Sequence, residues 1–277
     1  MRRAERHRIA AATWRAPAAG ALYGRVELDA AAALDHLRRL RAATGAQATI
    51  THLVGKAVGM ALVAAPDLNA RVVLGRLRPL PTVDVSFVVA TRAGSDLSSV
   101  RLRSVDQLSV VEIAGLLAER ADPVRQGDDA DFGRSTGLMA RIPFPLARPA
   151  LWAAGFVQSG LGMAVPLLGL KADAFGGAMV SSVASFGVEQ GFGALVPFTR
   201  VGALVLVGAV ADRPVVRDGQ VVVRPMVDLG ITLDHRLVDG AQLGPAIATL
   251  RRVIEAPDAA LGRPDAPASP TTTATPA

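Results

Sequence analysis

The chain has 277 residues, a formal net charge of +6 and an apolar fraction of 51%. This apolar fraction excludes a disordered protein, and the length suits one large domain or two small ones. The absence of cysteine excludes disulfides, cysteine nucleophiles and thiolate metal sites, and it fits a reducing cytoplasm.

The histidines and the basic residues exclude two further classes of site. His7, His36, His52 and His235 have no metal-ligand spacing, so the sequence predicts no zinc site. The arginines are spread along the chain beside one tyrosine and eight phenylalanines, and no basic block interleaves with aromatic residues. A nucleic-acid surface is therefore not expected, whereas a small anionic ligand would suit the positive charge.

The pattern of residues 1–45 predicts an arm, a strand and a helix. Residues 1–20 are basic and alanine-rich, without the apolar core of a signal peptide, and are expected to form an N-terminal arm. Leu22 to Leu28 alternates apolar and polar residues, as an edge strand does. Asp29 is expected to cap a helix that runs to Thr44 and stops at Gly45.

The next segments continue the α/β pattern. Thr51 to Ala65 is apolar nearly all round and predicts a buried helix, which the turn at Pro66 to Asn69 ends. We interpret that turn as helix termination and not as a ligand site. Val83 to Thr91 predicts a strand, and Leu97 to Leu102 is expected to pair with it.

A helix follows this strand pair, and its start carries a clear signal. Ser109 and Glu112 form a capping box, in which each side chain satisfies a backbone amide at the start of a helix. The helix is expected to run to about Asp122, where Pro123 breaks it.

The stretch from Pro149 to Leu170 contains no charged residue and is flanked by Arg148 and Lys171. Its length matches the roughly 20 residues of a membrane span. Polar residues, a proline and four glycines leave it only mildly hydrophobic, however. We therefore expect a pair of short helices packed on their own domain or on a neighbouring subunit. Contact with a membrane surface through residues 149–170, and a true span, are the alternatives.

The C-terminal half predicts a series of strands. Gly176 to Gly187 is expected to be a strand that passes into a glycine turn. Val201 to Ala211 is almost wholly apolar and predicts a strand buried on both faces. Val215 to Val223 predicts a hairpin around Asp218-Gly219, a strong hairpin signal.

The last strand, at Met226 to Leu233, leads into the sequence Asp-His-Arg-Leu-Val-Asp-Gly at residues 234–240. An amphipathic helix is expected from Ala241 to Glu255. After Pro257 the chain becomes rich in proline, alanine, serine and threonine, which predicts a disordered tail. Histidine has an unperturbed pKa near 6.5, so His235 can take and return a proton at neutral pH.

The sequence at residues 234–241 resembles the DHRxxDGA signature of the catalytic domain of 2-oxo-acid dehydrogenase acyltransferases, the dihydrolipoyl acyltransferase cores. Three upstream segments are similar to other segments of that family, and the resemblance covers about residues 20–128 and 174–258. These segments are Arg213 to Pro225, Pro66 to Ala70 and Val180 to Gly187. The resemblance implies an α/β fold like that of chloramphenicol acetyltransferase, a two-layer sandwich with a mixed sheet and helices on one face.

The resemblance also implies roles for single residues. His235 would be the general base that removes the proton of the attacking thiol of CoA or dihydrolipoamide. Ser181 would donate a hydrogen bond to the tetrahedral oxyanion, a contact worth about 10²-fold or more in rate. Asp239 would fix the loop by pairing with an arginine, or cap the last helix. Gly240 would permit a tight turn, and Asp234 would support the loop.

The family pattern further implies a homotrimer whose active sites lie between subunits, so His235 and Ser181 would come from neighbouring chains. Acyl-CoA would be a substrate, and the acyl acceptor would be a thiol or a hydroxyl. Because no lipoyl domain precedes the catalytic part, a lipoyl-bearing or acyl-carrier protein would have to supply a swinging-arm substrate. Residues 129–173 resemble nothing in the family and are expected to be an insertion that roofs the acyl pocket.

The expected organisation is thus an arm at residues 1–20, a catalytic domain at residues 21–260 and a disordered tail at residues 261–277. A non-catalytic oligomeric scaffold of the same fold is the alternative, although the retained histidine, acid, glycine and serine argue against it. A condensation-type acyltransferase shares His-x-x-x-Asp-Gly but places a second histidine where this chain has Asp234. The expected location is the cytoplasm, with membrane association through residues 149–170 as an addition.

Overall fold

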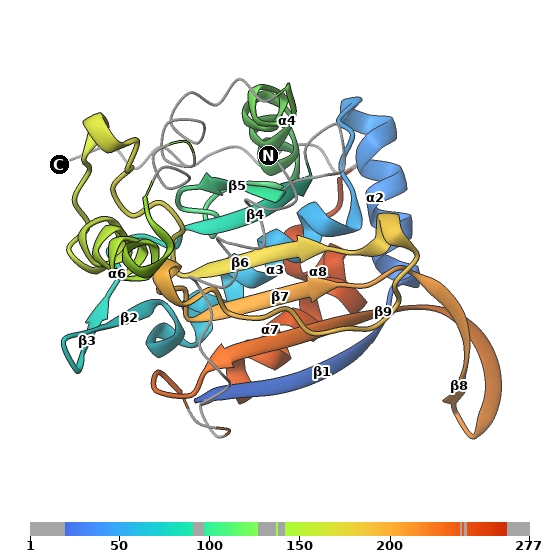
Figure 1. Cartoon of the computed structure of the whole chain (residues 1–277). Coiled ribbons are helices and arrows are strands. Elements are labelled where there is room, and N and C mark those ends of the chain that lie inside the picture. The colour runs from blue at the N-terminus through green and yellow to red at the C-terminus, as the bar shows by residue number, and fades with distance from the viewer. Residues whose placement is uncertain are drawn as a thin grey trace, which may run out of the picture.

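The computed structural model describes residues 20–90, 97–126, 137, 142–238, 240 and 243–264. A seven-stranded mixed sheet forms its centre, in the order β1-β9-β7-β6-β4-β5, with β8 paired to β9 (Figure 1). The strands of this sheet are β1 (Ala21–Asp29), β4 (Val85–Ala90), β5 (Leu97–Leu102), β6 (Ala178–Ser182), β7 (Ala203–Val207), β8 (Ala211–Arg217) and β9 (Gln220–Asp234). β6 runs parallel to β4 and β7, and the other pairs are antiparallel.

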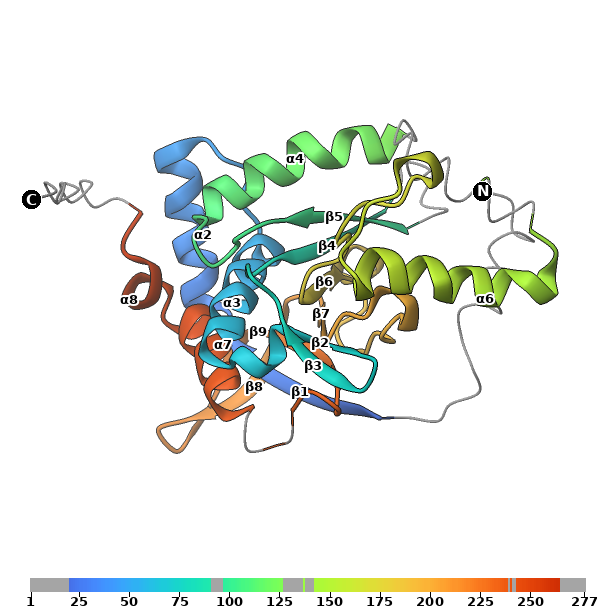
Figure 2. The ribbon, with the colours of Figure 1, turned by 90° about the vertical axis from the view of Figure 1, so that its left-hand side faces the viewer.

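Helices cover one face of this sheet, and one helix stands apart from them (Figures 1 and 2). The covering helices are α2 (Ala31–Thr44), α3 (Ile50–Ala64), α4 (Val110–Gln126), α7 (Gly244–Glu255) and the short α8 (Pro257–Leu261). Their apolar sides bury one continuous core against the sheet, with Leu28, Leu53, Ile113 and Leu229 completely excluded from solvent. This arrangement confirms the predicted two-layer α/β fold.

The remaining elements lie around this sandwich. A separate two-stranded hairpin is formed by β2 (Ala70–Val73) and β3 (Arg76–Pro79). α6 (Phe144–Gly155) lies toward the other face of the sheet (Figure 2) and runs directly into a π-helical turn, Phe156–Gly160. Single 3₁₀ turns occur at Pro66–Leu68, Pro166–Leu168, Ala184–Phe186 and Pro197–Thr199.

Several helix ends differ from the prediction. The N-cap of α2 is Ala30, because Asp29 still pairs with Met226 as the last residue of β1. The Asp29 carboxylate nevertheless accepts the Ala31 amide at 3.0 Å, so it serves the helix from one position earlier. The capping box of Ser109 and Glu112 is present, with both hydrogen bonds formed.

Proline 123 does not end α4, which continues to Gln126. The ring of a proline removes one amide donor, but its fixed φ is itself helical, so the turn that follows can stay helical. α7 begins at Gly244, and the predicted start at Ala241 lies outside the described residues. Pro257–Leu261 forms α8, where the sequence predicted the beginning of a disordered tail.

The uncharged stretch is not a pair of independent helices. Its first half belongs to α6, which starts at Phe144, before the stretch, and contains Pro149. Its second half holds the π turn and the 3₁₀ turn at Pro166–Leu168. In the part of the chain that the structure describes, no helix is long and apolar enough to cross a membrane.

The hairpin and the last predicted strand are one element. β9 is a single strand of 15 residues that pairs with β8 over its first half and with β1 and β7 over its second. Asp218 and Gly219 both adopt a positive φ at the tip, as a two-residue hairpin of type I′ requires. The strand continues through Pro225 because the carbonyl group of that residue, which proline retains, accepts the Ala30 amide at 2.8 Å.

Candidate active site

The residues after β9 form a tight turn at the end of the sheet. The Leu237 amide donates to the Asp234 carbonyl oxygen at 3.0 Å, and the Asp234 carboxylate accepts the Arg236 amide at 3.0 Å. The Asp234 amide in turn donates to the Gly202 carbonyl oxygen at 2.9 Å, which ties the turn to the start of β7. The turn therefore holds His235 at a fixed position while leaving it exposed.

One nitrogen of the His235 ring is hydrogen-bonded, and the other has no partner among the described residues. Its Nδ1 lies 2.7 Å from the Val238 carbonyl oxygen. A carbonyl oxygen can only accept a hydrogen bond, so the neutral ring carries its proton on Nδ1 and its lone pair on Nε2. The backbone amide of His235 also donates to the Gly20 carbonyl oxygen at 2.7 Å. This is the tautomer and anchoring that a general base needs.

Two buried side chains anchor the far side of the turn. Leu237 and Val238 are 5% and 3% exposed and belong to the main core. A Cβ atom on Gly202 would lie only 2.3 Å from Cδ1 of Leu237, so the turn packs directly against the bare backbone there. Core packing thus fixes the Val238 carbonyl group, which accepts the hydrogen bond from His235.

The structure describes some of the other residues of this loop and not others. Arg236 Nε donates to the Asp234 carboxylate at 2.8 Å, and this hydrogen bond raises the pKa of Arg236. Asp239 lies outside the described residues, so its predicted pairing with an arginine stays a prediction. Gly240 is exposed, and a Cβ atom there would meet nothing within 4 Å among the described residues, so the described part of the chain does not require glycine at this position.

Ser181 and Ser182 have different surroundings on β6. Val180 is fully buried in the core, and since side chains alternate along a strand, Ser181 faces the other side of the sheet. Ser182 Oγ accepts the Ala184 amide at 3.4 Å and so begins the 3₁₀ turn after the strand. Ser182 lies on the same face of the strand as Val180, whereas Ser181, which is half-buried, lies on the opposite face.

The sheet register separates His235 from Ser181 within one chain. Ser181 is aligned with Leu206 and through it with Gly230, whereas His235 lies five residues beyond Gly230 along β9. At about 3.3 Å per residue this is roughly 16 Å along the strands, with two strand spacings across the sheet in addition. A single chain therefore does not bring these two residues together.

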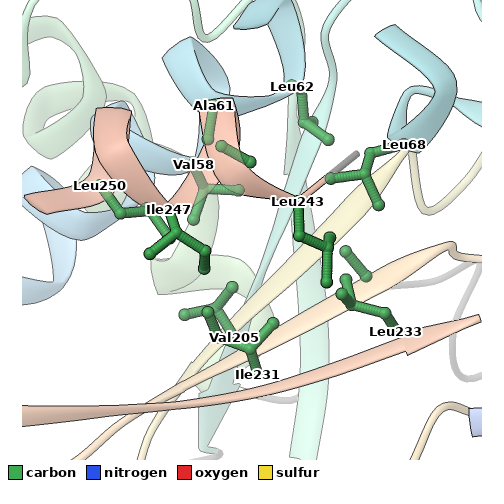
Figure 3. A pocket seen from close by; sticks show the side chains of 12 residues that line it. Val58, Ala61, Leu62, Leu68, Val205, Ile231, Leu233, Leu243, Ile247 and Leu250 are labelled. Atoms are coloured by element: carbon green, nitrogen blue, oxygen red, sulfur yellow. The ribbon is translucent and has the colours of Figure 1, made fainter. Parts of the chain in front are cut away.

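An apolar pocket lies behind the turn, between the sheet and two helices. Figure 3 shows Val205, Ile231 and Leu233 of the sheet pointing toward Leu243, the N-cap residue of α7, and Ile247 of that helix. Val58, Ala61 and Leu62 of α3 complete its upper wall. No residue that lines the pocket is polar, so it cannot take part in proton transfer, although Leu233 is only two residues from His235.

The other described histidines are occupied by structural contacts. His36 is 3% exposed and its Nδ1 lies 2.7 Å from the Asp258 carboxylate, which joins α2 to α8. His52 Nδ1 accepts the Thr49 amide at 3.0 Å in the capping box of α3. Burial, together with the positive charge of Arg41, lowers the pKa of His52 to about 4. Both residues are thus engaged in structural contacts.

Sequence reasoning missed Arg200, which lies close to the turn that carries His235. Its backbone has a φ of 56°, and its guanidinium group stands over the Phe156 ring. One signal was present in the sequence, because Arg200 is the only lysine or arginine between Lys171 and Arg213.

A comparison with protein families matches most of this chain. The model described as 2-oxoacid dehydrogenases acyltransferase (catalytic domain) matches residues 1–131 and 170–262. It leaves unmatched residues 132–169, which include α6 and the π turn.

Two curated proteins illustrate the level of similarity. The chain is 27% identical over 215 residues to the dihydrolipoyllysine-residue acetyltransferase component of the acetoin cleaving system of Bacillus subtilis. It is 30% identical over 184 residues to the lipoamide acyltransferase component of the branched-chain alpha-keto acid dehydrogenase complex of Pseudomonas putida. These matches cover 78% and 66% of this chain, but only 43% and 40% of the relatives, so the chain spans about two fifths of their length.

Solved structures share the fold at lower identity. A dihydrolipoamide acetyltransferase described as probable, from Listeria monocytogenes 4b F2365, superposes with a TM-score of 0.65 at 21% identity, over 91% of this chain and 90% of the other. The cubic core of the pyruvate dehydrogenase multienzyme complex gives 0.64 at 20% identity, covering 92% and 88%. A chloramphenicol acetyltransferase gives 0.51 at 14% identity, covering 91% and 95%, in agreement with the predicted fold.

Proposed function

The chain belongs to the family of 2-oxoacid dehydrogenase acyltransferase catalytic domains, and from this premise we propose that it moves an acyl group between CoA and a second thiol. His235 is the proposed general base and Ser181 the proposed oxyanion donor. The observation that carries the proposal is the hydrogen bond from His235 Nδ1 to the Val238 carbonyl oxygen, which leaves Nε2 unprotonated at the surface.

The proposed reaction needs no group beyond the two substrates. Nε2 of His235 takes the proton of the attacking thiol, and the resulting thiolate sulfur bonds to the carbonyl carbon of the acyl thioester. The carbonyl oxygen becomes an oxyanion, to which the Ser181 hydroxyl donates a hydrogen bond. The intermediate then releases the original sulfur as a thiolate, and the protonated His235 returns the proton to it.

Two chains are proposed to complete each site. The sheet register keeps His235 and Ser181 of one chain well apart, which supports a site built from the histidine of one chain and the serine of its neighbour. We propose a homotrimer as the unit that provides this arrangement.

The substrates are proposed from chemistry and from the relatives. The names of both curated relatives refer to lipoyl groups, so a dihydrolipoyl thiol, carried by a lipoyl-bearing protein or an acyl-carrier protein, is the proposed partner of CoA. We propose that residues 129–173, most of which the family model leaves unmatched, form a roof that selects the acyl group. A hydroxyl acceptor is the alternative.

A complementation experiment tests the base, the donor and the shared site together. His235→Ala should remove nearly all acyl transfer from acetyl-CoA to dihydrolipoamide, and Ser181→Ala should lower the rate about 10²-fold with the fold retained. Ser182→Ala is the matched control, because its hydroxyl serves the adjacent turn. When the two defective variants are co-expressed and purified as mixed oligomers, some sites receive an intact histidine and an intact serine.

With random mixing, about one quarter of the sites would pair an intact His235 with an intact Ser181 from a different chain. Acyl transfer by the mixed oligomer should therefore recover to about that fraction of the parent rate. If the mixed oligomer stayed as inactive as its components, a site between chains would be wrong. Transfer by His235→Ala at the parent rate would contradict the base.

A further inference from the structure

The backbone of Arg200 is held in a conformation that arginine seldom adopts. Its φ of 56° lies in the left-handed region, which residues other than glycine, asparagine and aspartate seldom adopt. Its guanidinium carbon stands 5.5 Å from the centre of the Phe156 ring, and Nη1 donates to the Val72 carbonyl oxygen at 2.9 Å. Arg200 ends the 3₁₀ turn Pro197–Thr199 in this conformation, and the two contacts hold its guanidinium group in one place.

Two further guanidinium groups lie near Arg200. Burial lowers the pKa of Arg200, and the positive charges of Arg236 and Arg71 lower it further. Arg71 is paired with the Asp173 carboxylate, and Arg236 is paired with the Asp234 carboxylate. Among the described residues no carboxylate is paired with Arg200, so three cations and two anions leave one positive charge without an anion.

This cluster also holds hydrogen-bond donors without acceptors. Arg71 is 4% exposed, and its Nε has no partner among the described residues. Ser159 is fully buried, and its hydroxyl likewise has no partner there, although its carbonyl oxygen accepts from Arg71 Nη1. Buried polar groups without partners are costly, so such a group in a native protein calls for an explanation, such as a ligand that pairs with it.

The cluster lies at the end of the sheet that carries the proposed base. Arg236 is the residue after His235, and the Gly202 carbonyl oxygen, two residues beyond Arg200, accepts the Asp234 amide at 2.9 Å. A ligand held by Arg200 would therefore approach the same turn as the reacting thioester.

We propose that Arg200, flanked by Arg71 and Arg236, binds an oxyanion of the acyl substrate. This inference rests on the proposed acyl transfer and adds a substrate class to it. A guanidinium group pairs with a carboxylate or a phosphate through two parallel hydrogen bonds. The oxyanion is either the far carboxylate of a dicarboxylic acyl group or a phosphate of CoA.

Three thioesters separate these two sources. Succinyl-CoA carries both anions, propionyl-CoA carries only the phosphates, and succinyl-pantetheine carries only the carboxylate. Their binding is measured by calorimetry with the full chain carrying His235→Ala, so that no turnover occurs. Arg200→Asn removes the cation and relieves the strain, because asparagine tolerates a positive φ. Arg38→Gln is the matched control, since it removes an exposed arginine on α2 that pairs with Asp35.

Arg200→Asn should bind succinyl-CoA about 10- to 100-fold more weakly than its parent, as expected for the loss of a hydrogen-bonded charge. The same loss with succinyl-pantetheine, but not with propionyl-CoA, identifies the carboxylate. An equal loss with both CoA esters identifies the phosphate. Arg38→Gln should bind all three thioesters like the parent.

Thermal unfolding checks that Arg200→Asn is folded, because this change removes the hydrogen bond to Val72 and the contact with the Phe156 ring. Arg200→Lys, which keeps the charge but not the paired hydrogen bonds, should bind with intermediate affinity.

Unchanged binding of all three thioesters by Arg200→Asn would overturn the subsite, as would a parent that binds none of them. The proposed function fails by a different result, namely acyl transfer by His235→Ala at the parent rate.

Discussion

At the scale of single residues, the chain uses the same side chain in opposite ways. His235 Nδ1 donates to a carbonyl oxygen, whereas His52 Nδ1 accepts a backbone amide. The first contact leaves the ring ready to take a proton at Nε2, and the second resists protonation of the ring at Nδ1. The position of a histidine in the sequence does not reveal which of these contacts it makes.

The pKa of His52 predicts a pH dependence of stability. Burial lowers this pKa from 6.5 to about 4, so between these values the unfolded chain takes up a proton that the folded chain refuses. The contribution of His52 is therefore complete above about pH 6.5 and is lost as the pH falls toward 4. His52→Gln keeps an acceptor for the capping box but does not titrate.

Urea unfolding at pH 7 and at pH 4.5 checks this prediction. The parent should lose about 1–3 kcal/mol more stability than His52→Gln over that interval. Equal losses in the two proteins would contradict the assignment.

The motif itself made His235 recognisable, but the sequence could not reveal how its turn is held. The contacts of Val238 and Gly202 are made by backbone atoms, which every residue has. The identity of these residues therefore does not indicate the contacts. Arg200 was missed for a related reason. Its importance depends on Arg71, which is far away in the chain, and on a φ value that the sequence does not encode visibly.

At the scale of elements, the sequence predicted correctly those turns and helix starts that are stabilised by hydrogen bonds between neighbouring residues. The hairpin at Asp218-Gly219 and the capping box at Ser109 both formed as predicted, because their own hydrogen bonds and φ values determine them. The helix end at Pro123 and the length of β9 were wrong. α4 continues to Gln126, and β9 is longer than predicted because it pairs with β8 over its first half and with β1 and β7 over its second. The short α8 was missed, and Asp258 of that helix pairs with His36 of α2.

Beyond the helix layer, a loop lies against the outer face of β9 and makes a stability prediction possible. A Cβ atom on Gly230 would lie 1.7 Å from the Gly191 carbonyl oxygen, and Thr232 Oγ1 donates to the Gly193 carbonyl oxygen at 2.7 Å. Gly230→Ala must push this loop away and should lower the free energy of unfolding by about 3 kcal/mol.

Gly24→Ala on the neighbouring strand β1 is the control, because a Cβ atom there meets nothing within 4 Å among the described residues. Chemical unfolding followed by circular dichroism should show a much smaller loss for Gly24→Ala, or a gain. Similar losses for the two variants would mean that the loop does not press on β9.

At the scale of the whole molecule, the net charge of +6 matters for the proposed substrate. CoA is an anion, so a positive protein attracts it over distances of about one Debye length. Raising the ionic strength from about 20 to 300 mM should therefore raise the KM for acetyl-CoA several-fold. The KM for acetyl-pantetheine, which lacks the phosphates, should stay nearly constant, and steady-state kinetics with both thioesters would show whether it does.

The length of β9 limits where insertions and deletions can be accepted in this chain. One strand joins the hairpin tip to the turn of His235, and its second half is locked between β1 and β7. An insertion or deletion after Met226 would shift His235 by about 3.3 Å per residue and turn alternate side chains to the wrong face. At the tip, by contrast, residues can be gained or lost in matched pairs without moving the histidine. Natural and engineered length variation should therefore collect at Asp218-Gly219, where a peptide tag can be inserted while acyl transfer is kept.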